Sequence, residues 1–274
     1  MSDGASPAHG PLGIIAGTGF YNLESLRDAT AFTHESAYGK AAVTRGLMHD
    51  RPTVFVSRHG VDHSTPPHMV NYLAVMQTMS DLEVTEILAI NVVGGIGHLA
   101  GDLVLVDDFI DFTRHRPLTF FDGSTPEGVV HIDMGEPYSQ RLREIWLQAA
   151  AAEGQPVTPT GVYGAFDGPR FETKAEIRAA RAAGVTVVGM TGVPEVVLAA
   201  EKRIEYAALC LVANPAAGLS DEAITMQDVM AVVGEGAGRV QRVLGRAAAI
   251  LAGGPAAASA QSGSRGGETS AGGR

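Results

Sequence analysis

The chain has 274 residues, of which 45% are hydrophobic and 18% are charged, and its formal net charge is −10. A chain of this length and composition buries a sizeable core, which excludes disorder over most of its length. The negative charge argues against a nucleic-acid or anionic-membrane surface as its function, and the single cysteine, Cys210, excludes an internal disulfide framework.

The first half of the chain predicts short buried strands, each followed by small, polar or basic residues. Residues 12–15 form a strand that ends at Gly17-Thr18-Gly19, and residues 53–56 form a second that ends at Arg58-His59-Gly60. A helical apolar spacing covers residues 70–82. The apolar run 86–93 predicts a buried strand that ends at Gly94-Gly95, and shorter strands follow at 103–106 and 109–110.

The second half alternates between helical and apolar stretches. Amphipathic spacing predicts helices over residues 137–153 and 173–183, and β-branched residues 185–188 predict a strand that ends at Met190-Thr191. Pro194 suits the first turn of the following helix, because its missing N–H would have no partner there. Residues 206–212 are a buried strand in which we interpret Cys210 as a small hydrophobic residue rather than a nucleophile. Thr225 and Asp228 form a capping box that opens the last helix.

The alternation of strands and helices, without a repeat or an internal linker, predicts one α/β domain over residues 11–251 with a largely buried mixed sheet. Residues 1–10 and the Gly-, Ala- and Ser-rich residues 252–274 are expected to be flexible termini. We expect a cytoplasmic protein without a membrane partner, because no signal-peptide pattern and no apolar run of about 18 residues occurs.

Four segments place ligand-binding groups directly after an apolar strand: Gly17-Thr18-Gly19, Arg58-His59-Gly60, residues 91–95 and Met190-Thr191. A guanidinium, two hydroxyls and backbone N–H groups suit the oxygens of a phosphate dianion, so we predict a phosphate site without a P-loop. Taken singly, the Gly-Thr-Gly segment could be an ordinary turn and Arg58 a solvated loop residue.

Histidines at 59, 63 and 68 raise the alternative of a zinc site. Pro66 and Pro67 prevent one continuous helix there, and no cysteine or carboxylate completes a tetrahedral set. We therefore expect no metal. An esterase is not indicated either, because the chain lacks a Gly-x-Ser-x-Gly elbow.

Residues 190–199 read Met-Thr-Gly-Val-Pro-Glu-Val-Val-Leu-Ala. This stretch resembles the signature of the trimeric purine nucleoside phosphorylase and methylthioadenosine phosphorylase family. Further matches occur in the same order along the chain, at the other three strand-end segments and at residues 70–72, 109–111, 120–123 and 168–171. The resemblance covers about residues 12–251. It implies a nucleoside phosphorylase fold with a distorted central sheet, and a homotrimer with active sites near subunit boundaries.

The resemblance also implies roles for individual residues. Phosphate would be bound by Thr18, Arg58, His59 and Thr191, together with the backbone of Val92. Met190 would lie against the ribose, Phe171 would pack on the base or sugar, and His131 would reach the neighbouring subunit's site near the 5′ group. Phosphate is then a co-substrate, and no metal or organic cofactor is implied.

Two positions predict the purine that is cleaved. Adenine-specific relatives carry an Asp where this chain has Asn214, and an amide can donate to O6 and accept from N7–H of a 6-oxopurine. Glu172 stands where 6-oxopurine phosphorylases have a Glu that accepts N1–H, a proton that adenine lacks. These two residues are the predicted catalytic pair. The alternative for Glu172 is an acid in the first turn of a helix, where negative charge is favoured.

Two further positions predict the 5′ substituent. Met226 occupies the place of a His in ordinary purine nucleoside phosphorylases, and Val229 follows one turn later. Apolar groups there would accept a methylthio group, unless both residues merely pack in the core. The combination describes 5′-methylthioinosine and resembles bacterial methylthioinosine phosphorylases. A methylthioadenosine phosphorylase, a general inosine or guanosine phosphorylase, and a non-catalytic nucleoside-binding scaffold are the alternatives.

Overall fold

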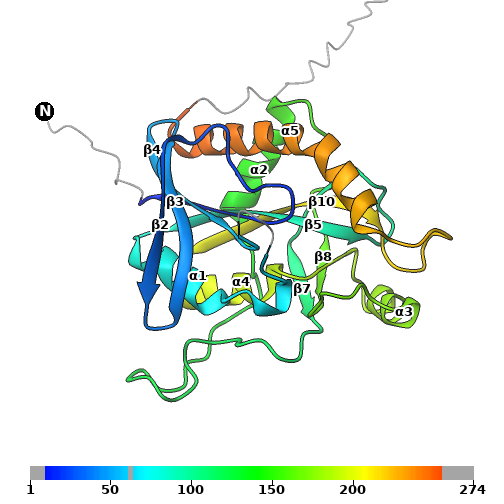
Figure 1. Ribbon diagram of the computed structural model, residues 1–274, viewed down its shortest axis with the longest axis horizontal. Coiled ribbons are helices and arrows are strands. Elements are labelled where there is room, and N and C mark those ends of the chain that lie inside the picture. Colours follow the sequence, from blue (N-terminus) through cyan, green and yellow to red (C-terminus); the bar gives the residue numbers. More distant parts are fainter. Residues whose placement is uncertain (1–9, 61–63, 255–274) are drawn as a thin grey trace, which may run out of the picture.

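A computed structural model describes residues 10–60 and 64–254, and a branched sheet of ten strands lies at its centre (Figure 1). The other residues, which include most of the predicted flexible termini, lie outside the described part. The strands are β1 (Leu12–Ala16), β2 (Arg27–Ser36), β3 (Gly39–Met48), β4 (Arg51–Ser57), β5 (Glu86–Gly95), β6 (Leu103–Leu105), β7 (Asp108–Asp111), β8 (Val162–Ala165), β9 (Val187–Gly189) and β10 (Glu205–Pro215). The helices are α1 (Tyr72–Asp81), α2 (Gln140–Ala152), α3 (Lys174–Ala182), α4 (Gly192–Glu201) and α5 (Met226–Leu251), with a 3-10 turn at Pro67–Met69.

The sheet runs in the order β2-β3-β4-β1-β5-β9-β8-β7, and β10 pairs with β5 and β6 beside this path. Strand β5 pairs in parallel with β1 and β10 and antiparallel with β9, so the sheet is mixed. Helices flank it on both faces: α2 and α5 lie above it in Figure 1, and α1 and α4 lie below. The predicted α/β fold with a central mixed, distorted sheet and flanking helices is confirmed.

Strand β5 is where the sheet divides. Its first half pairs with β1, from Glu86 to Ala89, whereas its end pairs with β9 at Gly94 and Gly95. On this side of β5, no described strand covers the residues between Ala89 and Gly94. The division therefore opens a gap in the middle of an otherwise continuous sheet, at the carboxyl ends of β1 and β5.

Both faces of the central strands are buried. In β10, Tyr206 and Cys210 belong to the core cluster that includes α1 and α4 residues, whereas Leu209 and Leu211 belong to the cluster that includes α2 and α5 residues. A strand that is buried on both faces reads as a continuous apolar run, which is why the sequence revealed β5 and β10 clearly.

Most predicted elements are present with ends shifted by one to three residues. The predicted helix 137–153 begins at Gln140, because Ser139 caps it by accepting the Leu142 N–H. Thr225 caps α5 by accepting the Asp228 N–H, as predicted, but the Asp228 carboxylate accepts the Thr225 hydroxyl, where a capping box would have it accept the Thr225 backbone N–H. Pro194 lies in the first turn of α4. The sequence analysis missed β2, β3 and β8. Strand β2 is largely exposed and polar, so it lacks the apolar pattern on which strand prediction depends.

Candidate active site

A cavity of about 640 Å³ opens at the division of the sheet. Its walls come from the ends of β1, β4, β5, β9 and β10 and from the start of α5. Every predicted site residue except His131 lines it: Thr18, Arg58, His59, Val92, Phe171, Glu172, Met190, Thr191, Asn214, Met226 and Val229. Residues that are far apart in the sequence therefore form one site.

Arg58 is buried and held in a fixed orientation. Its Nε donates to Oε1 of Glu195 at 2.5 Å, its Nη2 donates to Oε2 at 2.8 Å, and its Nη1 donates to the Ile90 carbonyl at 2.6 Å. Burial by itself lowers the pKa of Arg58, but the Glu195 carboxylate outweighs burial and raises it. A guanidinium has five N–H groups, so two remain for a ligand once these bonds to described residues are made. The alternative of a solvated loop arginine is wrong.

The bond from Arg58 to Ile90 also indicates how the β5 backbone is directed. The Ile90 carbonyl points into the gap between β1 and β9. Because backbone groups alternate in direction along a strand, the N–H and carbonyl of Val92 point to the same side. The structure thus directs the Val92 backbone toward the cavity that this residue lines.

The imidazole of His59 is oriented by the chain that follows it. Its Nδ1 lies 2.8 Å from the Thr65 carbonyl oxygen. A carbonyl can only accept, so Nδ1 carries the proton, and Nε2 is the acceptor in the neutral ring. Gly17 gives the Arg58 guanidinium room beside the end of β1, because a Cβ at residue 17 would lie 3.3 Å from Nη1 of Arg58, which is closer than most Cβ contacts.

The turn that carries Thr191 rests on Tyr163. The Tyr163 hydroxyl accepts the backbone N–H groups of Thr191 at 3.2 Å and of Gly192 at 3.1 Å. The sequence analysis expected backbone N–H groups of this turn to face the ligand, and for these two that expectation is wrong. What the turn offers the cavity is the Thr191 side chain. Gly189 is required here, because a Cβ on it would lie 2.3 Å from the Tyr163 oxygen.

Glu172 and Phe171 lie at another part of the cavity wall. Glu172 is only 8% exposed, and burial raises the pKa of its carboxyl above the usual value. It precedes Thr173, the N-cap of α3, and Glu176 is the acid in that helix's first turn. The alternative that placed Glu172 in the first helical turn is therefore wrong.

Asn214 lies near the end of β10, where the pairing with β5 is irregular between Val212 and Asn214. Its Nδ2 donates to the Pro215 carbonyl at 2.8 Å. Because that carbonyl cannot donate, the bond decides which end of the amide is nitrogen. Oδ1 and the second N–H of Asn214 are left for a ligand.

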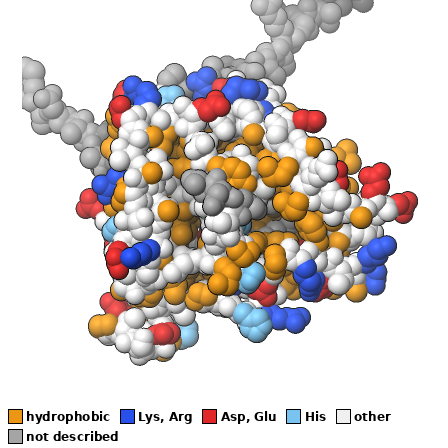
Figure 2. Space-filling view, in the orientation of Figure 1, with side chains coloured by type: hydrophobic (Ala, Val, Ile, Leu, Met, Phe, Trp, Pro, Cys, Tyr) orange, Lys and Arg blue, Asp and Glu red, His pale blue; other side chains and the backbone are white. Residues whose placement is uncertain are grey.

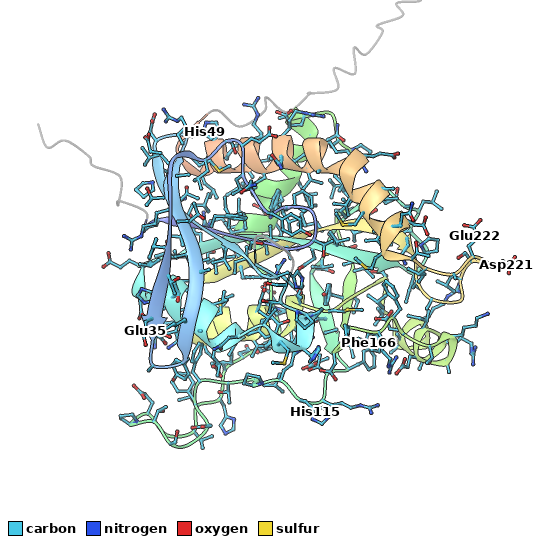
Figure 3. All side chains as sticks on the ribbon, viewed as in Figure 1. Glu35, His49, His115, Phe166, Asp221 and Glu222 are labelled. Carbon is cyan, nitrogen blue, oxygen red and sulfur yellow. The ribbon has the colours of Figure 1, made fainter. Side chains whose placement is uncertain are left out.

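The start of α5 forms an apolar part of the wall. Met226 is 48% exposed, so it is not a core residue, whereas Val229 both lines the cavity and packs into the core. The loop before α5 leads away from the body, and its acidic residues Asp221 and Glu222 lie at the outer edge in Figure 3. Met226 is thus the point at which an exposed loop meets the cavity.

Met190 is held where three loops meet. The Tyr72 hydroxyl donates to the Pro67 carbonyl at 2.8 Å and lies 3.4 Å from the Met190 carbonyl. Gly168 packs directly on the Met190 sulfur, since a Cβ there would lie 2.5 Å from it. This packing keeps the Met190 side chain at the cavity.

His131 is exposed and does not line this cavity. It belongs to residues 113–136, which we call the arm and which extends from the lower edge of the molecule in Figure 1. His115, labelled at the lower edge of Figure 3, lies near the start of the arm. The root of the arm is anchored, because Glu201 accepts from the Thr119 hydroxyl and the Phe120 N–H.

The described residues contain no cluster of three or more potential metal ligands. His63, one of the three histidines in the zinc alternative, lies outside the described part of the chain. Cys210 is buried, and burial raises the pKa of its thiol to about 12, as fits its interpretation as a hydrophobic residue. Every helix in the described residues is too short or too polar to span a bilayer.

Figure 2 shows one face of the molecule, on which acidic and basic side chains alternate around the rim and hydrophobic side chains lie toward the middle.

Reasoning from sequence missed two residues that shape the site, Glu195 and Tyr163. Glu195 follows Pro194 within the quoted signature, so its position was visible. Its role was not, because its partner Arg58 is 137 residues away.

Comparison with known proteins gives relatives along nearly the whole chain. Residues 11–249 match the phosphorylase superfamily. A probable S-methyl-5′-thioinosine phosphorylase from Methanopyrus kandleri is 47% identical over 227 residues, which cover 82% of this chain and 86% of the relative. A 6-oxopurine nucleoside phosphorylase from Pyrococcus furiosus is 40% identical over 227 residues, covering 80% and 84% of the two chains.

The fold is shared with a solved structure of methylthioadenosine phosphorylase from Schistosoma mansoni in complex with adenine. The TM-score is 0.84 at 30% identity, and the match covers 90% of this chain and 93% of that one. The family resemblance predicted from the strand-end segments is thereby confirmed. The chain belongs to the phosphorylase superfamily, and its fold is that of the nucleoside phosphorylases.

Proposed function

We propose that the protein is a purine nucleoside phosphorylase that prefers 5′-methylthioinosine, which it converts with phosphate to hypoxanthine and 5-methylthioribose 1-phosphate. One observation carries this proposal: a single cavity joins anion-binding groups, a carboxyl and amide suited to a 6-oxopurine, and an apolar wall. The relatives named as S-methyl-5′-thioinosine and 6-oxopurine nucleoside phosphorylases support it.

Phosphate would bind where Thr18, Arg58, His59 and Thr191 meet. The two remaining N–H groups of Arg58 donate to phosphate oxygens, and the hydroxyls of Thr18 and Thr191 add further bonds. In the neutral His59 ring, Nε2 accepts a hydrogen bond from the P–OH group of hydrogen phosphate. This arrangement holds the anion in place to attack C1′ as the glycosidic bond lengthens.

The base departs with the electron pair of the glycosidic bond, so the site must stabilise negative charge on the purine. Asn214 serves this purpose, because its free N–H donates to O6. Its Oδ1 accepts a hydrogen bond from N7–H once N7 has taken up, through solvent, the proton that hydrogen phosphate loses overall. The Glu172 carboxylate accepts N1–H, and Phe171 packs on the ring. The bond from the Asn214 N–H to O6 strengthens as negative charge develops on the purine, which lowers the barrier rather than only tightening substrate binding.

The second candidate is a 5′-methylthioadenosine phosphorylase. The fold shared with the Schistosoma mansoni enzyme favours it. Asn214 and Glu172 oppose it, since adenine has no N1–H for Glu172 to bind. A general inosine or guanosine phosphorylase is opposed by Met226 and Val229, which would leave a 5′-hydroxyl without a partner.

One experiment separates these candidates. Phosphate-dependent release of base is measured from methylthioinosine, methylthioadenosine, inosine and guanosine at equal concentrations. We expect the highest kcat/KM for methylthioinosine, no release without phosphate, and unchanged activity in EDTA because we propose no metal or organic cofactor. Faster cleavage of methylthioadenosine would replace the first proposal with the second.

We also propose a homotrimer, in which the arm carries His131 to the neighbouring subunit's cavity near the 5′ group. The exposure of His131 and of the apolar arm residues Leu118, Val129 and Val130 supports a role in contact with another copy. The cytoplasmic location stays a prediction.

A further inference from the structure

A buried carboxylate lies directly behind the proposed phosphate site. The Glu195 side chain is 1% exposed, and its two oxygens accept Nε and Nη2 of Arg58. Oε2 also accepts the Tyr206 hydroxyl at 2.9 Å. An acid in this position is unexpected, because a negative charge behind an anion site repels the ligand.

The ionisable groups near this part of the cavity indicate the role of Glu195. Arg58 and His59 are the basic residues among the described cavity lining, and Glu172 is the acid. With Glu195 paired to Arg58, the two side chains together contribute little net charge to the cavity. A buried arginine without a partner would be costly, so the pair keeps the fold stable when no anion is bound.

We propose that Glu195 is a positioning and charge-balancing residue for phosphate, which fixes the guanidinium of Arg58 and limits how tightly the anion binds. This inference rests on the proposed phosphorylase function and adds a determinant of phosphate affinity. Phosphate is then held mainly by oriented hydrogen bonds instead of by net attraction. A nucleophile bound in this way keeps its reactivity, because ground-state binding that is too tight would raise the barrier to reaction.

Glu195→Gln tests the charge, and Glu195→Asp tests the geometry. The glutamine keeps an oxygen for Arg58 and can donate to the Tyr206 oxygen, but it leaves the arginine charge unbalanced. We expect a lower melting temperature in phosphate-free buffer and a larger rise on adding inorganic phosphate than in wild type. The apparent Kd for phosphate should fall by about tenfold or more, as removal of a nearby like charge predicts. Glu195→Asp keeps the charge but shortens the reach, so its phosphate affinity should fall.

Kinetics give a readout that a merely structural role would not move. In Glu195→Gln, the KM for phosphate should fall while the KM for the nucleoside changes little. The kcat should fall as well, because the extra affinity is for bound phosphate rather than for the transition state.

A second buried pair provides the matched control. Nη1 of Arg51 lies 2.6 Å from Oε2 of Glu86, their side chains are 7% and 3% exposed, and neither lines the cavity. Oε1 of Glu86 also accepts from Arg141, so Glu86 balances two arginines. Glu86→Gln should lower the melting temperature in phosphate-free buffer without an enhanced response to phosphate. An equal phosphate response in both variants would overturn the proposal.

The outcomes distinguish the two levels of inference. If phosphate fails to stabilise the wild-type protein, the phosphate site and the proposed function fail. If it stabilises wild type but binds Glu195→Gln no more tightly, the role of Glu195 fails alone. Glu195→Gln that does not fold even in phosphate would also overturn that role, because the bound anion should replace the missing charge.

Discussion

The Tyr163 hydroxyl accepts the backbone N–H of Thr191 at 3.2 Å, and this bond connects the start of β8 to the turn that presents Thr191 to the cavity. Tyr163 is fully buried, and burial raises the pKa of its hydroxyl to about 12. The ring therefore stays neutral at physiological pH and serves as a fixed acceptor for two backbone amides.

Tyr163→Phe should disturb the phosphate end of the cavity without touching the base end. Two buried N–H groups lose their acceptor, which costs on the order of 1–3 kcal/mol of folding free energy per unsatisfied group. We expect a lower melting temperature and a KM for phosphate raised several-fold, with the KM for the nucleoside nearly unchanged. An equal increase in both KM values would show that Tyr163 supports the whole cavity instead.

Asn214→Asp should shift the preference for the base. The new carboxylate faces O6, so two acceptors meet where a hydrogen bond existed. The loss of about 1–3 kcal/mol corresponds to a fall in kcat/KM for methylthioinosine on the order of 10- to 100-fold. The kcat/KM for methylthioadenosine should rise relative to that for methylthioinosine, because the carboxylate accepts a hydrogen bond from the 6-amino group. Adding Glu172→Ser should complete the shift, and a double variant that still prefers methylthioinosine would contradict the assignment of both residues.

Activity and stability should depend on pH through Glu172. Its folded-state pKa lies above the usual 4.5, so the folded protein holds this proton more tightly than the unfolded chain does. Stability from the protonated form is therefore lost as pH rises from about 4.5 through the raised pKa. Glu172→Gln should gain stability relative to wild type over that window, as denaturant unfolding at several pH values would measure.

The same ionisation should switch on turnover of 6-oxopurines. Only the ionised Glu172 accepts N1–H, so kcat/KM for methylthioinosine should rise with pH over the same window. Glu172→Gln should lose most of this dependence, together with much of its activity. An unchanged pH profile in the variant would assign the ionisation to another group.

Met226→His should raise kcat/KM for nucleosides with a free 5′-hydroxyl. The residue is half exposed at the start of α5, so the substitution should cost little stability. A histidine can bond the hydroxyl, and we expect the ratio of kcat/KM for inosine over methylthioinosine to rise by roughly tenfold. Leucine at the same position is the matched control and should leave the ratio in favour of methylthioinosine.

If the arm carries His131 to a neighbouring subunit's cavity, a substitution in one subunit should change the activity of another. Light scattering should give the mass of a trimer, and His131→Ala should lower activity without changing that mass. Mixing His131→Ala with Asn214→Asp, which has reduced activity on methylthioinosine, should restore part of the activity on that substrate, because some mixed sites contain neither substitution. A fully active monomer would rule out a shared site.

Several features of the protein were determined by local sequence alone. Apolar strands that end in glycine, hydroxyl or basic residues revealed the ligand-binding segments, because the carboxyl ends of strands in such sheets meet at one edge. Residues of all four segments line one cavity. The other predicted cavity residues, Phe171, Glu172, Asn214, Met226 and Val229, came from the family resemblance. Helix caps such as Thr225 were also predictable, since their signal lies within four residues.

Tertiary structure decided the remainder. The division of the sheet at β5 places Arg58 against Glu195, although 137 residues separate them in the chain. The tertiary structure also gives the backbone N–H groups of Thr191 and Gly192 to the Tyr163 hydroxyl, so they are not directed to a ligand. This outcome depends on the pairing of β8 with β9. Strand β2, polar and exposed, exists because β3 pairs with it. In each case the deciding partner is distant in sequence, and a local pattern carries no information about a bond that only folding brings within reach.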